Sequence, residues 1–287
     1  MKLTHAAIFF GAVTALAVVA PLVAPLEAQR WRTLDAQRQL ADSAPLTVRV
    51  EYVAGQLEMR PAVGRTLYKM SMKYDAERSD PLTRFDAAGH ALTLGLRSRG
   101  VNFGKSDSDG GALHAELSDK VPMDLVLELG AIKGDLQLGG LRLTDFSLKA
   151  GAADITVHFD KVNPERLRHM QFEIGAADVK IVHAANSGVE KVTANIGVGA
   201  LDFDLTDPLT HDVDITATVA MGDFTLRVGS DVGVYVDEKT VLADFDKSGL
   251  VKKGDGYYSE NFNAAPRKVR MHVKAVLGSF KLIRSGR

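Results

Sequence analysis

The segment of this chain whose residue types come nearest to a metal site runs from Asp244 to Asp255. It reads D-x-D-x-S-G over Asp244, Asp246 and Ser248, with an aspartate at the twelfth position, which is the layout of oxygen ligands in a calcium-binding loop. Two features weaken the match. The twelfth position usually carries glutamate, whose longer side chain binds the ion through both oxygens, and the flanking K-T-V-L-A and G-Y-Y-S do not resemble paired helices. We therefore expect a solvated loop and predict no metal site.

A second set of carboxylates follows small residues at recurring places: Asp135, Asp154, Asp178 and Asp223. Stacked aspartates bind cations in calcium-binding β-rolls, but those repeats are about nine residues long. The aspartates of this chain lie about twice as far apart as that spacing, and Ala200 interrupts their row. Aspartate also stabilises turns by accepting hydrogen bonds from nearby backbone N–H groups, and we expect that role for these residues.

The histidines do not suggest a catalytic or metal-binding cluster. His158 and Asp160 share one face of an expected strand, and His169 and His183 fall in the next repeat. The alternation points His158 outward and His183 inward, whereas a metal site needs ligands that converge. The phosphate loop, the G-x-S-x-G nucleophile elbow and the H-E-x-x-H zinc motif are absent from the sequence. The sequence therefore predicts no catalytic, cofactor-binding or metal-ligating residues, and a protein that is not an enzyme.

The elements that would position any site follow one pattern around small residues. Apolar residues lie two and four places after the small residue, and mostly three, five and seven places before it, as in Leu127, Leu129 and Ala131. The small residues are Gly55, Gly134, Ala153, Ala177, Gly199, Gly222 and Gly278, and the pairs after them are Leu57/Met59, Leu136/Leu138, Ile155/Val157, Val179/Ile181, Leu201/Phe203, Phe224/Leu226 and Phe280/Leu282. A period of two indicates strands with one buried face, and its repetition indicates an array of strand pairs.

The spacing of the small residues predicts a stack of similar coils. From Gly134 to Gly222 they recur about every 20–25 residues, and a longer interval before Gly278 leaves room for one or two further coils. The C-terminal segment V-R-M-H-V-K-A-V-L-G-S-F-K-L-I-R alternates basic with apolar residues. It predicts a last strand pair at a solvated edge, where basic side chains discourage edge-to-edge aggregation.

The N-terminus has the composition of a secretory signal peptide. Lys2 and His5 form a short basic lead, the run from Ala6 to Val23 is apolar and uncharged, and Ala28 offers a small residue for cleavage. We predict a signal peptide over residues 1–28, cut after Ala28; the alternative is an N-terminal membrane anchor, because the run is long enough to span. Residues 29–45 are polar and aperiodic, which predicts a flexible leader. No second apolar run of spanning length follows.

Composition narrows the function classes. The chain of 287 residues contains no cysteine, which excludes disulfides, thiol nucleophiles and zinc–thiolate sites. Its formal net charge is −1, whereas nucleic-acid binding calls for a clustered basic surface. We therefore expect a fold that is held together by packing alone and that has no nucleic-acid partner.

The repeats resemble those of a known family. The segments F-S-L-K-A-G-A-A-D-I-T-V-H-F and F-E-I-G-A-A-D-V-K-I, the stretch V-E-Y-V-A-G-Q-L-E-M-R-P and the C-terminal V-L-G-S-F-K-L are similar to segments of the bacterial toast-rack domains, the group that includes the LiaF-like cell-envelope-stress domain. The resemblance runs from Leu46 to Ile283. It implies an all-β, right-handed, single-stranded β-helix-like solenoid outside the cytoplasm. Characterised members of the family modulate envelope-stress signalling through protein contacts.

We expect an N-terminal toast-rack-like β region over residues 46–122 and a LiaF-like β-solenoid region over residues 123–287. An antiparallel β-sandwich of strand pairs is the alternative fold. The predicted function is that of an exported, periplasmic or extracellular, non-enzymatic scaffold that binds an envelope protein or a cell-surface polymer. The alternatives are a β-helical enzyme that acts on polysaccharide, which would need carboxylates converging in a groove, and a surface adhesin.

Overall fold

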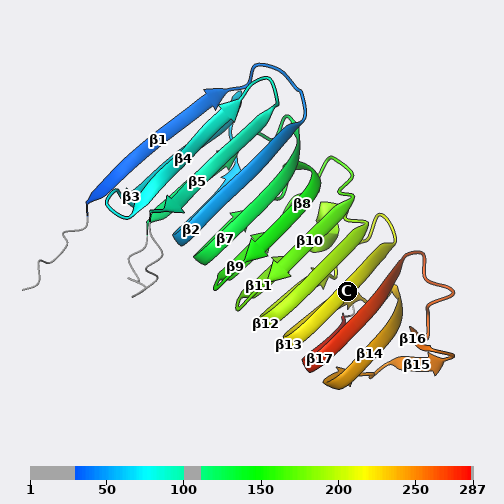
Figure 1. The fold of residues 1–287 in the computed structure, drawn as a ribbon. Helices are drawn as coiled ribbons and strands as arrows, with labels where there is room; N and C mark the ends of the chain where they lie inside the picture. Colours follow the sequence, from blue (N-terminus) through cyan, green and yellow to red (C-terminus); the bar gives the residue numbers. More distant parts are fainter. Residues whose placement is uncertain (1–29, 100–110, 286–287) are drawn as a thin grey trace, which may run out of the picture.

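The chain folds into a long stack of β-strands (Figure 1). The computed structural model describes residues 30–99 and 111–285, so the predicted signal peptide and its cleavage after Ala28 lie outside the described residues. The elements in chain order are β1 (Trp31–Gln39), β2 (Leu46–Pro61), β3 (Thr66–Asp75), β4 (Ser79–Asp86), β5 (Ala91–Ser98), β6 (Ala112–Leu117), β7 (Pro122–Gln137), β8 (Arg142–Ala150), β9 (Asp154–His158), β10 (His169–Ile174), β11 (Asp178–Val182), the short 3-10 helix η1 (Ala184–Ser187), β12 (Lys191–Leu205), β13 (Val213–Gly229), β14 (Gly233–Asp246), β15 (Leu250–Lys253), β16 (Gly256–Ser259) and β17 (Lys268–Ser285).

Parallel pairing builds the body of the stack. Each repeat contributes two strand segments joined at a bend, and each segment pairs with its equivalent in the next repeat. β8, β10 and the first half of β12 form one parallel row, and β9, β11 and the second half of β12 form the other. The predicted all-β class is confirmed, and the body is not the alternative sandwich of antiparallel strand pairs. The handedness of the chain path stays a prediction.

One continuous hydrophobic core fills the stack from Leu46 to Leu282. All the residues predicted two and four places after the small residues are buried, which confirms the expected alternation. Aromatic side chains stack along the core. The ring centroids of Phe146 and Phe172 lie 6.1 Å apart, as do those of Phe172 and Phe203, in edge-to-face contact. Such contacts join neighbouring coils through dispersion and quadrupole interactions.

The predicted position of the bend was wrong for the repeat around Gly134. Gly134 was expected at the bend and Ala131 in the core, but Ala131 is exposed. In the register, Ile132 rather than Gly134 aligns with Gly55, and Gly134 faces Ile155. The reason lies in the bend of β7, where Gly130 and Ala131 are consecutive residues outside the core and the chain changes phase between the buried Leu129 and the buried Ile132. A bend that places two successive residues outside shifts the period of two by one residue.

The order of strands at the C-terminal end also differs from the expectation. β17 is not at the edge: it lies between β13 and β14 and pairs in parallel with both (Figure 1). Its inward residues Val269, Met271 and Val273 are almost completely buried and are covered from both sides. β14 is therefore the outer strand of the stack, although it precedes β17 in the chain.

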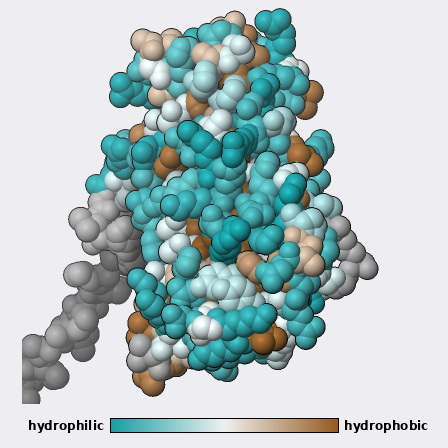
Figure 2. Space-filling model, turned by 90° about the vertical axis from the view of Figure 1, so that its right-hand side faces the viewer, coloured by the Kyte–Doolittle hydropathy of each residue, from teal (hydrophilic) through white to brown (hydrophobic). Residues whose placement is uncertain are grey.

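β14 closes this end with polar residues at positions that are apolar elsewhere. Glu238 and Thr240 align with Val273 and Ala275 of β17, and Glu238 lies 3.3 Å from the Lys247 ammonium and accepts a hydrogen bond from Thr240. The β15–β16 hairpin covers the first half of β14. The side of the molecule that includes this end is largely hydrophilic (Figure 2). Inward charges at a terminal strand discourage further strand addition.

The N-terminal end is closed by antiparallel strands. β2 lies between β7 on one side and β5 with β6 on the other, so hydrogen bonds join the two regions predicted as residues 46–122 and 123–287. β3 pairs antiparallel with β6, and β1 pairs antiparallel with β3. Most of the stretch predicted as a flexible leader, residues 29–45, is therefore strand β1. Backbone pairing orders it, together with the packing of Leu34 and Ala36 against the core, although its sequence shows no period.

Candidate binding groove

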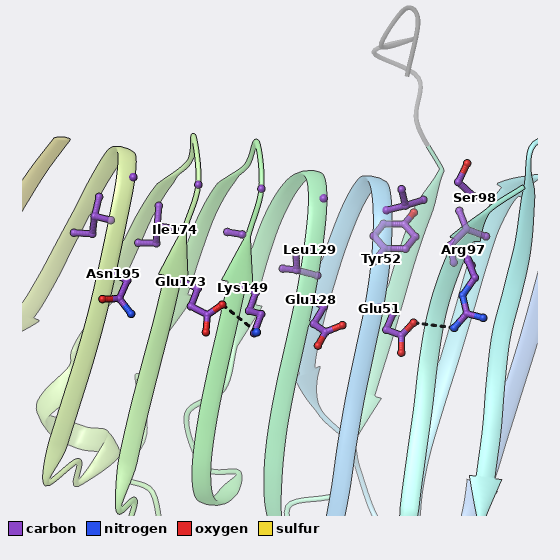
Figure 3. A pocket seen from close by; sticks show the side chains of 18 of the residues that line it. Glu51, Tyr52, Arg97, Ser98, Glu128, Leu129, Lys149, Glu173, Ile174 and Asn195 are labelled. Atoms are coloured by element: carbon purple, nitrogen blue, oxygen red, sulfur yellow. Dashed lines mark hydrogen bonds and ion pairs between the residues drawn. The ribbon is translucent and has the colours of Figure 1, made fainter. Parts of the chain in front are cut away.

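A shallow groove runs along the bends of successive coils (Figure 3). It crosses β5, β2, β7, β8, β10, β12 and β13, and its volume is about 1130 Å³. Neighbouring strands lie ~4.8 Å apart, so seven strands give a length of roughly 29 Å, enough for about eight or nine residues of an extended chain. The groove therefore has the dimensions of a site for a linear polymer rather than for a compact metabolite.

The floor of the groove is a column of small residues. Gly130, Gly151, Gly175 and Gly197 occupy equivalent places at the bends of β7, β8, β10 and β12. A Cβ at Gly130 would lie 2.2 Å from the Val53 carbonyl oxygen, and one at Gly197 would lie 2.9 Å from the Gly175 oxygen. Close approach of neighbouring backbones therefore excludes larger residues at these four bends, where the floor presents peptide groups beside apolar side chains such as Leu129 and Ile174.

One wall of the groove is a polar row that follows the register of the strands. Its members are Glu51, Glu128, Lys149, Glu173, Asn195 and Thr218. The charged members are held by ion pairs: Arg97–Glu51 at 3.2 Å, Arg49–Glu128 at 2.5 Å and Lys149–Glu173 at 3.0 Å. Figure 3 labels Glu51, Glu128, Lys149, Glu173 and Asn195 along this wall. They remain partly exposed, so each carboxylate keeps oxygens available to a ligand.

Tyr52 is the one lining residue in the described chain whose buried polar atom lacks a partner. Its side chain is 1% exposed, and its hydroxyl makes no hydrogen bond among the described residues. A Cβ at Gly55 would lie 2.8 Å from this hydroxyl, so glycine makes room for it. Burial raises the pKa of the Tyr52 hydroxyl, which keeps it protonated. An unsatisfied buried donor beside a groove is costly unless something completes it.

The carboxylates on the wall of the groove are all paired with basic side chains. General acid–base chemistry needs a proton donor or acceptor that is free to reach the substrate. Glu51, Glu128 and Glu173 contact Arg97, Arg49 and Lys149 respectively. The wall presents three carboxylates, an ammonium, an amide and a hydroxyl in one row, and such a row suits a ligand that repeats polar groups along its length.

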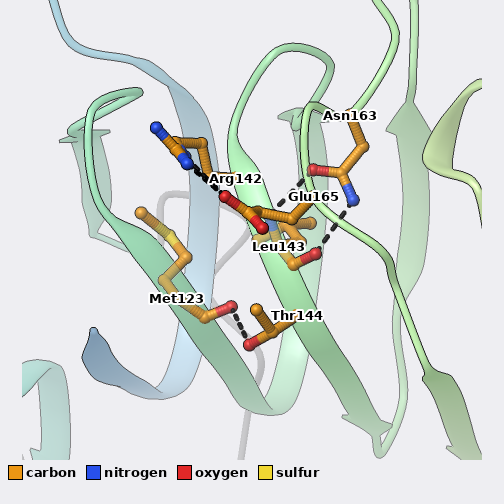
Figure 4. A network of polar contacts seen from close by, with 6 residues as sticks. All are labelled: Met123, Arg142, Leu143, Thr144, Asn163 and Glu165. Carbon is orange, nitrogen blue, oxygen red and sulfur yellow. Dashed lines mark hydrogen bonds and ion pairs between the residues drawn. The ribbon is translucent and has the colours of Figure 1, made fainter.

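A polar network of a different kind involves the loop between β9 and β10, which leads from one coil to the next (Figure 4). Asn163 is buried and bridges three backbone groups: its Oδ1 accepts from Leu143 N–H at 2.9 Å, and its Nδ2 donates to the carbonyls of Leu143 at 2.9 Å and Ser187 at 3.0 Å. Nearby, Arg142 donates to Glu165. These contacts join consecutive coils, and they have a structural role.

The acidic segment from Asp244 to Asp255 does not assemble a cation site. Asp244 lies in β14, Asp255 lies in the turn between β15 and β16, and Asp246 accepts hydrogen bonds from the backbone N–H and the hydroxyl of Ser248. Within residues 30–99 and 111–285, no group of three histidine, cysteine or acidic side chains could hold a metal ion.

The predicted aspartates lie in one row only in part. Asp154 and Asp178 are directly opposite each other, and Asp178 faces Ala200, which faces Asp223. Asp135 is displaced and pairs with Thr156, because the bend of β7 lies two residues before the predicted one and Lys133 is opposite Asp154. Asp223 accepts a hydrogen bond from the Ser279 hydroxyl at 2.7 Å, which is a contact between strands rather than the expected turn contact.

The histidines are separated, as the alternation indicated, but His183 does not point inward. A left-handed backbone conformation, with φ 56° and ψ 37°, ends the strand at His183 and begins η1, so the ring turns outward. Its Nδ1 lies 2.7 Å from Asp207 Oδ2, whereas His169 contacts Thr193.

His183 provides a test of pH dependence. The hydrogen bond to Asp207, reinforced by the charge of that carboxylate, raises the pKa of His183 above its usual value. Protonated His183 therefore stabilises the fold. This contribution is fully present below the unfolded-state pKa of about 6.5 and is lost as the pH rises through the folded-state pKa. We expect an NMR titration to show the raised pKa, and Asp207→Asn to remove the rise. An unchanged pKa in that variant would contradict the assignment.

The groove residues were not singled out in the sequence, although a signal for them exists. Counted from the small residue at each bend, the floor lies two places before it and the polar wall four places before it, as for Gly151 and Lys149 before Ala153. Aligning these offsets across repeats would have shown both rows.

Among the described residues, no helix has the length and apolar character needed to cross a membrane.

The fold and groove define a class of protein: an all-β scaffold of parallel stacked coils with a linear surface groove. Residues 27–182 match the family described as the N-terminal domain of toast_rack, DUF2154, and the chain belongs to that family. No curated protein matches the chain.

Solved structures with a similar arrangement include two bacterial proteins. One is described as a candidate cell adhesion protein from Clostridium sporogenes, with 12% identity, a TM-score of 0.45, and coverage of 89% of this chain and 100% of that one. Another is described as a candidate adhesin from Bacteroides fragilis, with 10% identity, a TM-score of 0.45, and coverage of 88% and 97%. Both likenesses are too distant to carry a functional role to this chain.

Proposed function

We propose that this protein is an exported, non-enzymatic binding scaffold of the cell envelope, whose groove holds a linear cell-surface polymer. The observation that carries the proposal is the groove itself, which crosses seven strands and has glycine at the bends of four of them. A linear ligand lying along it would meet a polar side chain at every coil, from Glu51 to Thr218. Binding spread over many evenly spaced contacts suits a repeating polymer.

Two further points support this proposal. The apolar segment Ala6–Val23 and the small residue Ala28 suit export. Ion pairing of the wall carboxylates supports a binding role over catalysis, because a reacting group must be free. A right-handed path of the chain, the rule for parallel strands joined by crossovers, is part of the proposal, as is a link to the envelope-stress response through contacts of this scaffold. A role as a surface adhesin would use the same groove.

Blocking the groove tests the proposal. Asn195 is exposed on the wall in β12, toward the C-terminal end of the groove, so Asn195→Trp places a large ring across the ligand path. We expect binding to isolated cell-wall polysaccharide to weaken at least tenfold, about 1.4 kcal/mol. The matched control is Lys180→Trp, at an exposed position of β11 outside the groove, which should bind like the unaltered protein.

Two results would overturn the proposal. Equal binding by the Asn195→Trp and Lys180→Trp variants, with both folded by circular dichroism, would show that the groove is not the site. Cleavage of the polysaccharide by the purified protein, lost in the Glu173→Gln variant, would favour the β-helical enzyme instead.

A further inference from the structure

Large exposed apolar residues gather at one corner of the stack. Val198, Met221, Leu277 and Leu242 are directly opposite one another in successive strands β12, β13, β17 and β14, and their exposed fractions are 55%, 53%, 37% and 74%. Val276, next to Leu277, is 52% exposed. We name these five residues the apolar ridge. A contiguous exposed apolar strip on a soluble domain marks an interaction surface.

The ridge lies along the bends toward the C-terminal end, beyond most of the groove. The same column continues toward the N-terminal end as alanines, at Ala176, Ala152 and Ala131, which are exposed as well. Large apolar side chains therefore project only where the groove ends. Each coil contributes a side chain ~4.8 Å from the next, so the ridge is a straight and regular strip.

Opposite charges flank the ridge. On one side, Thr218, Lys274 and Lys239 form a row across β13, β17 and β14. On the other side, Asp223, Ser279 and Asp244 form the matching row. Lys239 and Asp244 are both exposed and lie on either side of Leu242 in the same strand. The strip is therefore apolar along its centre, basic along one margin and acidic along the other.

We propose that the apolar ridge is the interface between two copies of this chain, related by a twofold axis parallel to the ridge. Rotation about that axis brings the basic margin of one copy over the acidic margin of the other. Lys239 then faces the partner's Asp244, and Asp244 faces the partner's Lys239, at the level of Leu242. A surface that is complementary to itself under a twofold rotation is the requirement for an isologous dimer.

The margins also distinguish this partner from other occupants. An anionic lipid surface attracts Lys274 and Lys239 but repels Asp223 and Asp244, which lie as close to the ridge. Addition of a strand to the free edge of β14 is opposed by the inward Glu238, which is bound to Lys247. A second copy satisfies the apolar centre and both margins at once.

Sedimentation equilibrium of the purified protein without the predicted signal peptide tests the proposal. We expect a dimer whose dissociation constant rises at least tenfold in Leu242→Asp and in Met221→Asp. Val162→Asp is the matched control, because Val162 is 65% exposed in a return loop away from the ridge, and it should leave the dimer intact. A monomer at all concentrations, or equal effects of Leu242→Asp and Val162→Asp, would overturn the proposal.

Charge exchange tests the geometry. Lys239→Asp and Asp244→Lys each place like charges opposite each other and should weaken the dimer. The double variant restores two opposite-charge contacts and should recover most of the affinity. Failure of the double variant to recover, with both single variants folded, would exclude the twofold axis along the ridge. Adsorption to anionic phospholipid vesicles by a monomeric protein would favour a lipid surface instead.

Discussion

The Phe203→Ala variant is expected to lose ~3–5 kcal/mol of the free energy of unfolding, the usual cost of truncating a buried phenylalanine. Phe203 is completely buried in β12, and its ring packs edge-to-face on Phe172, with centroids 6.1 Å apart. Truncation removes apolar contacts and leaves a cavity between coils that pack tightly. Urea unfolding followed by circular dichroism measures the loss, with Lys180→Ala as the control that should change stability by less than about 0.5 kcal/mol.

The stacked architecture adds a second measurement for the same variant. Each repeat contacts mainly its neighbours, so the free energy of unfolding is close to a sum of local contributions. Part of the lost stability can therefore appear as local unfolding of the coils around Phe203. Hydrogen exchange should therefore accelerate in β10, β12 and β13, while the N-terminal strands β2 and β7 change little. A loss below about 1 kcal/mol with uniform exchange would mean that the aromatic column does not hold the coils together.

The sequence predicted which residues are buried because that information is local. Alternation over three or four residues decides which side of a strand faces the core, whatever its neighbours are. This is why pairs such as Leu201/Phe203 and Phe224/Leu226 were placed correctly. The repetition predicted an array of strand pairs, whereas the solenoid was implied by the resemblance to the toast-rack domains.

Neighbour relations between strands could not be predicted in the same way. Alternation in β17 shows that one face of the strand is buried, but it does not say whether a further strand lies outside it. The distinguishing residue is Glu238, at an inward position of β14. A charge there indicates the end of the stack, and reading it would have moved β14 to the edge and β17 inside. Likewise, backbone pairing with β3 orders β1. Such pairing does not require alternating apolar residues, so the sequence of β1 did not predict a strand.

The groove was missed because its residues are defined by the bend and not by the strands. Gly151 and Gly175 lie two places before the small residues on which the pattern was built, and Lys149 and Glu173 lie four places before them. Only the register, which sets Lys149 opposite Glu173, makes them neighbours along one wall. A functional surface of a repeat protein is formed by equivalent residues of successive repeats, whereas a motif search compares residues that are close together in the sequence.

Asn163→Leu is the second change with a large expected effect, although it removes no apolar contact. Leucine has nearly the same shape but cannot replace the amide, so Leu143 N–H and the carbonyls of Leu143 and Ser187 lose their partner inside the protein. Each buried polar group left unsatisfied costs ~1–3 kcal/mol. We therefore expect a loss of about 3 kcal/mol or more, measured by urea unfolding.

Glu165→Gln is the matched control for Asn163→Leu, because it weakens a contact in the same network (Figure 4). The Arg142 and Glu165 side chains are 38% and 26% exposed, and a partly exposed ion pair contributes at most about 1 kcal/mol. The buried neutral amide should therefore matter more than the neighbouring ion pair. Water can replace the partner of an exposed charge, but it cannot reach the backbone groups that Asn163 holds. If Glu165→Gln cost as much as Asn163→Leu, the return loops would be joined by charge, and the buried amide would not be what aligns the coils.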